Sequence, residues 1–501
     1  MTRDARLYRF PARDRTGWLL GLQGAQCVIL GIGIFASGIL LNVGAPAPVI
    51  LAVIAVAGIA TFAPLAGRPG YAWIPILIGW LPGRRGGGGL WTADVPRVQL
   101  GQDSRHEQPQ WPPFLKGIEL HEALGWRPGT TMAVVTERRS GNATGLLRVT
   151  GREFALIDRS EQEQLLAGWG DALAAFCKER TPVVAARWFE WSAPADGSAH
   201  LRWTRDHIGP AADPALVDEY LDMVATAGPL STRHETIVTV TVGGSGGGFG
   251  RRAGQRSRDL VDTLRDELRL LADRLAATGL SVDPPLSTSD AVEVIRSRLD
   301  PSTAPARSVT GAGRTLAGMA GIQRVRNAGP MATKTEWTHL VVDGAMHACF
   351  AVVEWPRLEV PPNWMEPILL HAGGTRTIAM HLEPIAPSQS RRRVDKDSTR
   401  LVVDAEQRSR AGFRVGALHR RAESDVAARE SELVAGFCEL EFCGLVTVTA
   451  VDVDQLERSC AEWEQVASHS GLQLRRLNGQ HASAFACTLP LGIGPGRRSW
   501  E

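Results

Sequence analysis

The glycine-rich stretch "GGSGGGFGRR" at residues 243–252 holds the residues of this chain best suited to binding a phosphate group. A β-branched run at residues 234–242 precedes it, and a helix-like pattern at residues 256–280 follows it. A strand, a glycine loop and a helix form the arrangement in which backbone amides and a helix N-terminus bind phosphate. The candidate contact residues are Gly246, Gly248, Gly250, Arg251 and Arg252.

The residues around this loop do not complete a nucleotide-binding motif. A P-loop ends in Gly-Lys followed by Ser or Thr, whereas two arginines follow Gly250. Of the lysines, only Lys334 precedes a Thr, and it follows Thr333 rather than a glycine. The glycines are also spaced too tightly for G-x-G-x-x-G. We therefore expect a flexible connector, whose arginines could contact an anionic partner or lipid, and we predict no cofactor.

The histidines and cysteines form no recognisable catalytic or metal-binding motif. The phrase "HEALGW" at residues 121–126 lacks the second His of a zinc-protease helix. The 7 cysteines are scattered through apolar segments without a C-x-x-C pair, which indicates buried hydrophobic roles. We therefore predict that the protein is not an enzyme and has no catalytic or metal-binding residues.

A long uncharged stretch predicts a membrane hairpin near the start of the chain. No charged residue occurs from Gly17 to Gly67, and about 20 apolar residues suffice to span a bilayer. The expected spans are residues 18–41 and 49–65, joined by the turn "NVGAPAP". A third apolar stretch at residues 71–81 is too short to span, so it lies either at the headgroup layer or against the soluble part. The anchoring residues are Trp18, Leu41, Val49, Leu65, Tyr71, Trp73 and Trp80.

The distribution of arginine predicts the orientation of this hairpin. Arginines lie before the first span (Arg3, Arg6, Arg9, Arg13, Arg15) and after the second (Arg68, Arg84, Arg85), and the connecting turn has none. The positive-inside rule then places both termini and the bulk of the chain in the cytoplasm, with the hairpin in the inner (cytoplasmic) membrane. A cleaved signal peptide is the alternative, but the apolar segment is too long for one and a second span follows it.

The rest of the chain has the pattern of an α+β protein. With 501 residues and 44% hydrophobic content, it can form two or three packed units. Its net charge of +2 provides no strongly basic face, so direct nucleic-acid binding is not expected. Alternating strand and helix patterns predict two related α/β modules, the second with a long helical pair at residues 388–436. In the first module we expect a strand at residues 154–158 and a helix capped by Ser160, with Glu163 completing a capping box.

These patterns give a division of the chain into five segments. The segments are a basic cytoplasmic N-terminus (1–16), a transmembrane hairpin (17–67), an interfacial segment and linker (68–130), a first cytoplasmic module (131–330) and a second cytoplasmic module (331–501). The outline of hairpin, helix, strand, long helix, strand and helix is shared by the two modules. This shared outline indicates a diverged internal duplication.

The second module resembles the N-terminal region of the conjugation-type ATPases that energise type IV secretion. The resemblance rests on "VVDGAMHACFAVVEWP", "TRTIAMHLEPIAPSQSRRR" and the closing phrase "GQHASAFACTLPLG", which precedes the motor domain in that family. Here only "IGPGRRSWE" follows, so the resemblance does not extend to the motor or to ATP hydrolysis. Together with a front end similar to the two-span inner-membrane subunit of those systems, the chain resembles the actinobacterial SCO-type conjugation membrane proteins. This resemblance implies a structural component whose partners are a separate motor ATPase, other membrane subunits and the bilayer, within a larger oligomeric assembly.

Two other interpretations compete with this one. The EccE family, a peripheral membrane component of type VII (ESX) secretion, also has an N-terminal hairpin, a cytoplasmic part of similar size and a helix like "RDELRLLADRLAATGL". A membrane-bound enzyme with an unrecognised nucleotide site in "GGSGGGFGRR" is the other. The order of "HLEPI" and "GQHASAFACTLPLG" favours the conjugation family.

Overall fold

The computed structural model describes residues 7–10, 24–65, 67–85, 89–94, 108–151, 154–194, 204, 207–209, 212–227, 232–243, 253–303, 328–410, 412 and 416–496. The chain falls into two compact units. Unit 1 comprises Met1–Arg9, Gly89–Pro387 and Cys438–Glu501, and unit 2 comprises Phe10–Gly88 and Ser388–Phe437.

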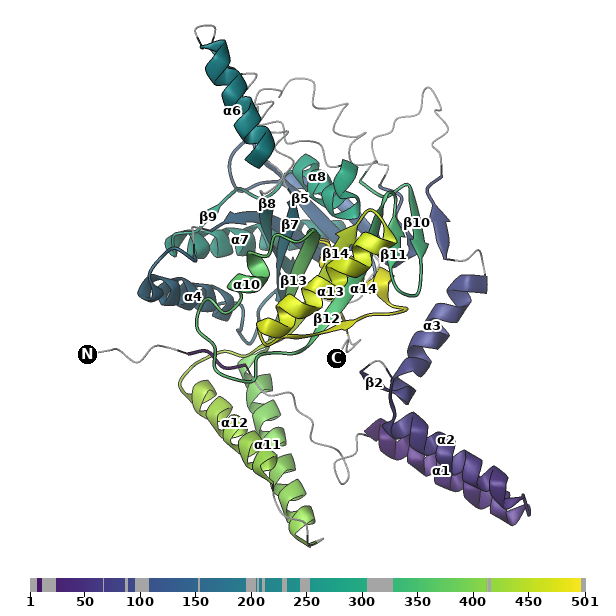
Figure 1. The fold of residues 1–501 in the computed structure, drawn as a ribbon. Helices are drawn as coiled ribbons and strands as arrows, with labels where there is room; N and C mark the ends of the chain where they lie inside the picture. Colours follow the sequence, from purple (N-terminus) through teal and green to yellow (C-terminus); the bar gives the residue numbers. More distant parts are fainter. Residues whose placement is uncertain are drawn as a thin grey trace. The chain divides into compact units, whose positions relative to one another are not determined.

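Unit 1 is built on one large antiparallel sheet (Figure 1). Its strands follow the order β3-β10-β11-β12-β14-β13-β7-β8-β6-β5-β4, and β9 and β15 pair with β6 and β12. The strands are β3 (Leu90–Thr92), β4 (Ile118–Leu124), β5 (Thr131–Glu137), β6 (Asn142–Thr150), β7 (Val183–Pro194), β8 (Thr232–Val242), β9 (Ser281–Val282), β10 (Ala332–Thr335), β11 (Leu340–Val342), β12 (Ala345–Glu354), β13 (Thr375–Pro384), β14 (Leu440–Ala450) and β15 (Gln473–Arg476). The chain is therefore a mixed protein of helices and a large antiparallel sheet, as the α+β pattern predicts.

The pairing of β7 with β13 joins the earlier and later parts of the chain in this sheet. The register runs from Ala186 opposite Leu382 to Ser192 opposite Arg376. We call the β7–β13 pairing the seam of the sheet. On its outer sides, β7 pairs with β8 and β13 pairs with β14. The sheet is thus continuous between the strands that precede residue 304 and those that follow residue 327.

The residue types of the central strands explain why they form. β8 reads TRHETIVTVTV and β14 reads LEFCGLVTVTA, and β-branched residues of this kind fit a pleated, buried surface. Successive residues of β8 are buried on both sides of the sheet, with Ile237, Val238, Thr239 and Val240 at most 2% exposed. Helices must therefore cover both faces.

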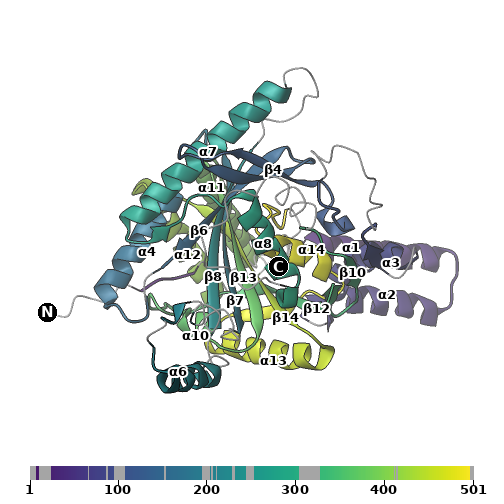
Figure 2. The ribbon, with the colours of Figure 1, turned by 90° about the horizontal axis from the view of Figure 1, so that it is seen from above.

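One face of the sheet carries a single core that crosses the seam. Helices α8 (Thr288–Leu299) and α14 (His481–Thr488) cover this face (Figure 2). Phe189 of β7, Ala379 of β13 and Phe485 of α14 belong to the same buried cluster. This shared core binds the two parts of the sheet into one body.

The opposite face carries two separate cores. Helices α4 (Arg159–Ala174) and α7 (Ala253–Ala277) pack against β5, β6, β7 and β8. Helices α10 (Glu366–Leu369) and α13 (Val453–His469) pack against β12, β13 and β14. The outer helix α6 (Pro214–Ala227) lies between β7 and β8 in the sequence. Short 3-10 helices η2 (Pro113–Leu115) and η4 (Pro301–Thr303) complete the described part of unit 1.

Two local predictions for the first helix of unit 1 are wrong. Residues 154–158 form a turn rather than a strand, and the Phe154 carbonyl accepts a 2.7 Å hydrogen bond from the side chain of Gln162. The N-cap of α4 is Asp158 rather than Ser160, because the Asp158 carboxylate accepts from the Glu161 amide at 2.9 Å and from the Ser160 hydroxyl at 2.7 Å. A carboxylate is the stronger acceptor at a helix N-terminus.

Unit 2 contains an apolar part and a polar part. The apolar part has α1 (Gly24–Asn42), α2 (Ala47–Phe62), the two-residue strands β1 (Pro64–Leu65) and β2 (Arg68–Pro69), η1 (Gly70–Ala72) and α3 (Trp73–Arg85). The polar part has α11 (Pro387–Arg410) and α12 (Ala417–Val434). These two helices are linked by an ion pair between Asp397 and Arg429 at 3.0 Å and by His419, which lies 3.4 Å from Asp404.

Candidate functional site

The contact between α1 and α2 is made by small residues. Gly33 and Ser37 are the buried residues of α1, and Thr61 is the buried residue of α2. A Cβ atom on Gly33 would lie 2.6 Å from the Cβ of Ala57, so the helices approach closely at this point. Ser37 and Thr61 donate their hydroxyl protons to carbonyls four residues earlier, at 2.8 and 2.7 Å. Small residues spaced by four are the interface typical of membrane helices.

The outer surface of this hairpin is apolar. Ile34 and Phe35 are each 72% exposed, and Leu51 and Val56 are each 66% exposed. A helix pair in water would bury its large apolar residues and expose its small and polar ones. Here the arrangement is the reverse, so the hairpin suits a lipid environment.

The helix lengths set limits on how a bilayer is crossed. Among the described residues, α1 is the helix that is long and apolar enough to span a membrane, and a signal sequence would pass the same test. Its 19 residues extend about 28 Å at 1.5 Å per residue, close to the hydrocarbon thickness of about 30 Å. The 16 residues of α2 extend about 24 Å, which is less than that thickness.

The structure places the predicted anchoring residues on several elements. Leu41 lies in α1 and is 66% exposed, and Val49 lies in α2 and is 45% exposed. Leu65 is not part of the second helix, which ends at Phe62, because it pairs with Arg68 in the short β1–β2 ladder.

The three aromatic residues that were predicted as anchoring residues follow this ladder. Tyr71 lies in η1, and Trp73 and Trp80 lie in α3, where the Arg68 guanidinium stands 5.8 Å from the centre of the Trp73 ring. Trp and Tyr side chains of this kind are enriched at membrane–water interfaces. Trp18 lies outside the described residues.

Residues 244–252 of the glycine loop also lie outside the described residues. This applies to Gly246, Gly248, Gly250, Arg251 and Arg252. The flanking elements are β8 and α7, so a strand and a helix adjoin the loop as predicted. Both neighbours of β8 are antiparallel to it, however, whereas P-loops and dinucleotide folds place such a strand in a parallel sheet. The same stretch contains the G-x-S-x-G pattern at residues 243–247, and the hydrolase fold that uses this pattern requires a parallel sheet as well.

A buried charge cluster, which sequence reasoning missed, lies on the face covered by α8. The Glu235 carboxylate accepts a hydrogen bond from Nε of Arg148 at 2.9 Å. It also forms an ion pair with Arg298, whose Nη2 lies 2.6 Å away. The Arg298 guanidinium also stacks on Trp191, 4.6 Å from the ring centre. Burial opposes ionisation of Glu235, but Arg298 and Arg148 outweigh it and lower the pKa of this carboxyl. The sequence signal for the cluster is a lone acidic residue inside the β-branched strand "HETIVTVTV".

The cavity beside this cluster is too small for a nucleotide. Its volume is about 10 Å³, and its lining includes Arg148, Arg233 and Glu235 from the sheet and Glu293 from α8. Such a space holds about one water molecule. The cluster therefore serves to hold α8 on the sheet.

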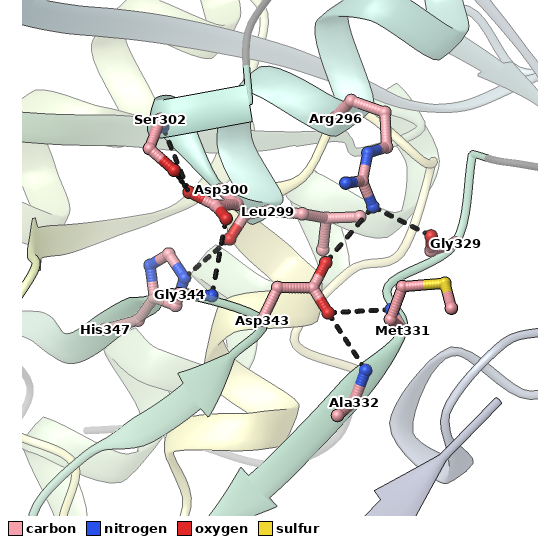
Figure 3. Close-up of polar contacts among 10 residues, drawn as sticks. All are labelled: Arg296, Leu299, Asp300, Ser302, Gly329, Met331, Ala332, Asp343, Gly344 and His347. Carbon is pink, nitrogen blue, oxygen red and sulfur yellow. Dashed lines mark hydrogen bonds and ion pairs between the residues drawn. The ribbon is translucent and has the colours of Figure 1, made fainter.

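A second polar cluster connects α8 and η4 with strands β10, β11 and β12 (Figure 3). Asp343 accepts from the amides of Met331 and Ala332, at 2.7 and 2.9 Å, and pairs with Arg296 at 3.2 Å. His347 lies 3.0 Å from the Leu299 carbonyl. Burial lowers the pKa of His347 to about 4, so its imidazole is neutral near pH 7. These contacts tie the end of α8 to the later strands.

A larger surface pocket lies beside Val360. It has a volume of about 390 Å³ and is lined by Pro361, Asn363, Trp364, Glu366, Pro367 and Leu370. Its size is within the range of small-molecule pockets, but Glu366 is its one ionisable lining residue and accepts from Asn363 at 2.9 Å. The lining offers no nucleophile with an adjacent base.

Within the described ranges, no group of three His, Cys, Asp or Glu residues could hold a metal ion. A scan of protein-family models found no family that matches this chain, and a search of curated proteins found no match either.

Proposed function

We propose that this chain is a membrane-anchored, non-catalytic structural component of a type IV-like conjugation or secretion apparatus, which docks a separate motor ATPase. The observation that carries the membrane part is the α1–α2 hairpin, where Gly33, Ser37 and Thr61 face inward and Ile34 and Phe35 face outward. The docking part rests on the resemblance described above.

The N-terminal arm supports a topology with both ends of the hairpin on one side of the membrane. Tyr8 and Val360 exchange two backbone hydrogen bonds, each 2.9 Å long. Tyr8 precedes α1, and Val360 belongs to the sheet-containing unit that follows α3. A chain that starts and finishes on the same side crosses the bilayer an even number of times. Crossing by α1 alone would separate Tyr8 from Val360, so we assign one crossing to α1 and one to α2.

The arginine distribution supports the direction of this topology. Arginines flank the hairpin before α1 and after α2, and the turn between the helices has none. The cytoplasm is then the side of both termini and of unit 1. A cleaved signal sequence fits less well, because cleavage would remove Tyr8 from the body it pairs with.

The strand order supports the proposed internal duplication. Outward from the seam, the first part of the chain has the order β7-β8-β6-β5-β4, and the second part has the order β13-β14-β12-β11-β10. The accessory strands match as well, because β9 pairs with β6 as β15 pairs with β12. Helices α7 and α8 follow β8 and β9 as α13 and α14 follow β14 and β15. We therefore interpret the body as two related modules joined through β7 and β13.

The duplication gives two helical arms that suit a scaffold. In the first module α6 is inserted after β7, and in the second module α11 and α12 are inserted after β13. Because β7 and β13 are antiparallel, these insertions leave from opposite ends of the seam strands. On α6, Leu216 and Met223 are 65% and 57% exposed. We assign these arms to contacts with neighbouring subunits or the motor.

Labelling from outside the cell tests the topology. Val43, in the α1–α2 turn, is 76% exposed, so Val43→Cys should react with a membrane-impermeant maleimide in intact cells. Cys438 in unit 1 is exposed and should react only after permeabilisation. Labelling of both cysteines, or of neither, in intact cells would refute the hairpin.

Purification from native cells tests the function. The full chain is extracted in mild detergent, and the proteins that accompany it are identified by mass spectrometry. Recovery with a hexameric ATPase of the conjugation type would support the proposal. Recovery with ESX components would assign the chain to type VII secretion, and recovery alone with bound nucleotide would favour an enzyme.

A further inference from the structure

Cys177 and Cys438 lie together in unit 1 although they are far apart in sequence. Cys177 lies three residues after the end of α4, and Cys438 lies two residues before the start of β14. The Ala174 carbonyl accepts from the Cys177 amide at 3.0 Å and from the Cys438 thiol at 3.7 Å. In return, the Cys177 thiol donates to the carbonyl of Glu439, the neighbour of Cys438, at 3.5 Å. Each thiol therefore contacts the backbone that carries the other.

The two thiols differ in their access to solvent. Cys438 is exposed, whereas Cys177 is 4% exposed. Burial raises the pKa of the Cys177 thiol, and with smaller contributions from the adjacent Cys438 thiol and the Glu439 carboxylate the pKa reaches about 11. A dissolved oxidant thus reaches Cys438 first, and Cys177 is held behind it as an internal partner.

We propose that Cys177 and Cys438 form a reversible thiol–disulfide site, at which a peroxide oxidises Cys438 and Cys177 then closes an intramolecular disulfide. The disulfide joins the segment after α4 to the segment before β14, and so cross-links the earlier and later parts of unit 1. It is independent of the secretion role, since it rests on these two side chains alone.

The chemistry balances in two steps. The Cys438 thiolate attacks one oxygen of hydrogen peroxide, the O–O bond breaks, and sulfenic acid and water form after proton transfer. The Cys177 thiolate then attacks the Cys438 sulfur, the S–O bond breaks, and hydroxide leaves as water. Overall, two thiols and one peroxide give one disulfide and two waters, and a thiol reductant restores the starting state.

The buried partner makes the second step pH-dependent. With a pKa of about 11 at Cys177, the thiolate fraction rises about 100-fold between pH 7 and pH 9. Disulfide closure should accelerate over this interval to a similar extent. At pH 7 the Cys438 sulfenic acid should survive long enough for capture by dimedone.

The test uses the full-length chain in detergent micelles, treated with hydrogen peroxide at pH 7 and pH 9. Digestion after glutamate separates Cys438 from the neighbouring Cys443, because Glu439 and Glu441 lie between them. We expect a cross-linked peptide pair containing Cys177 and Cys438, lost on reduction. Cys177→Ser should retain the dimedone adduct at Cys438 without the cross-link, and Cys438→Ser should lose both.

Cys443→Ser is the matched control, because Cys443 is less exposed and lies in the same strand region. It should form the cross-link at the wild-type rate. Disulfides between two copies through Cys438, over-oxidation of Cys438 without closure, or cross-linking to Cys443 would each overturn the proposal. Oxidation should also raise the melting temperature of the wild type and leave that of Cys438→Ser unchanged.

Discussion

Replacing Glu235 by Gln should weaken the fold strongly, because it removes the carboxylate that pairs with the buried Arg298 and the partly buried Arg148. The side chains of Glu235 and Arg298 are 6% and 2% exposed, and that of Arg148 is 17% exposed. Breaking a buried ion pair by removing one partner costs about 3–5 kcal/mol, because the other charge stays buried. Domains of ordinary stability have about 5–15 kcal/mol in total, so Glu235→Gln should remove a large share of it.

Glu457→Gln is the matched control for this prediction. Glu457 also pairs with an arginine through two hydrogen bonds, to Arg476 at 2.7 and 2.8 Å, but its side chain is 49% exposed. Exposed pairs contribute about 0–1 kcal/mol. The two variants therefore make the same chemical change and differ in the burial of the pair.

The assay is urea unfolding of the full chain in detergent at pH 7, followed by tryptophan fluorescence. Trp191 stacks on Arg298 and so reports on the cluster directly. The pKa of Glu235 is lowered in the folded state, so its contribution is present above its unfolded pKa and is lost as pH falls through the folded pKa. The difference between wild type and Glu235→Gln should therefore shrink in acid. Equal losses for Glu235→Gln and Glu457→Gln at pH 7 would refute the reasoning.

Three further predictions concern the hairpin, the buried histidines and a buried arginine. Gly33→Leu should separate α1 from α2, because even a Cβ atom at this position would meet Ala57. Gly38→Leu should leave the helix pair intact, because nothing lies within 4 Å of a Cβ atom there. The yield of disulfide cross-linking between cysteines placed in the two helices measures their separation. Burial lowers the pKa of His347 to about 4 and of His381 and His481 to about 3, so below pH 6.5 the unfolded chain binds protons that the folded chain does not. Stability should fall with acid by about 1.4 kcal/mol per pH unit for each histidine between pH 6 and 4.5, and His381→Gln should reduce the slope of the unfolding midpoint against pH by about one third. Arg376→Met should cost about 3 kcal/mol in urea unfolding, since Arg376 is fully buried and donates to the carbonyls of Leu369 and His371, both at 2.6 Å; a loss below about 1 kcal/mol would contradict this.

Most of the individual helices and strands discussed above could be predicted from the sequence. The β-branched run at residues 234–242 lies in β8, and the amphipathic pattern at residues 256–280 corresponds to most of α7. Periodicity and residue type decide such elements, because they depend on neighbours a few positions away. The errors at residues 154–158 and at Ser160 arise where a turn and two adjacent cap candidates compete. There a side-chain contact, such as that of Gln162 with the Phe154 carbonyl, decides the outcome.

The strand order could not be predicted from the sequence, because strand pairing joins residues that are far apart in the chain. Nothing in β7 or β13 alone indicates that Phe189 lies opposite Ala379. The hydrophobic pattern fixes which residues face a core but leaves open which strand supplies the neighbour. The apolar helix near the N-terminus could be predicted for the opposite reason. A stretch without charge from Gly17 to Gly67 needs no long-range partner to be recognised, although the inward position of Gly33 and Ser37 required the structure.

Buried charges could have narrowed the choice of pairing. Charged residues occur inside otherwise apolar strands at Arg187, Glu190 and Glu235, and an ionised side chain in a core requires a partner. Glu235 of β8 finds Arg148 in the adjacent strand and Arg298 on the helix above, and Glu190 of β7 lies 2.7 Å from His234. Each such residue excludes the strand pairings in which its charged group would be buried without a polar partner. A charged residue within a predicted strand is therefore first a restriction on which strands can pair, and only then a candidate for catalysis. In the described part of this chain, the charged residues of the central strands restrict the pairing in this way.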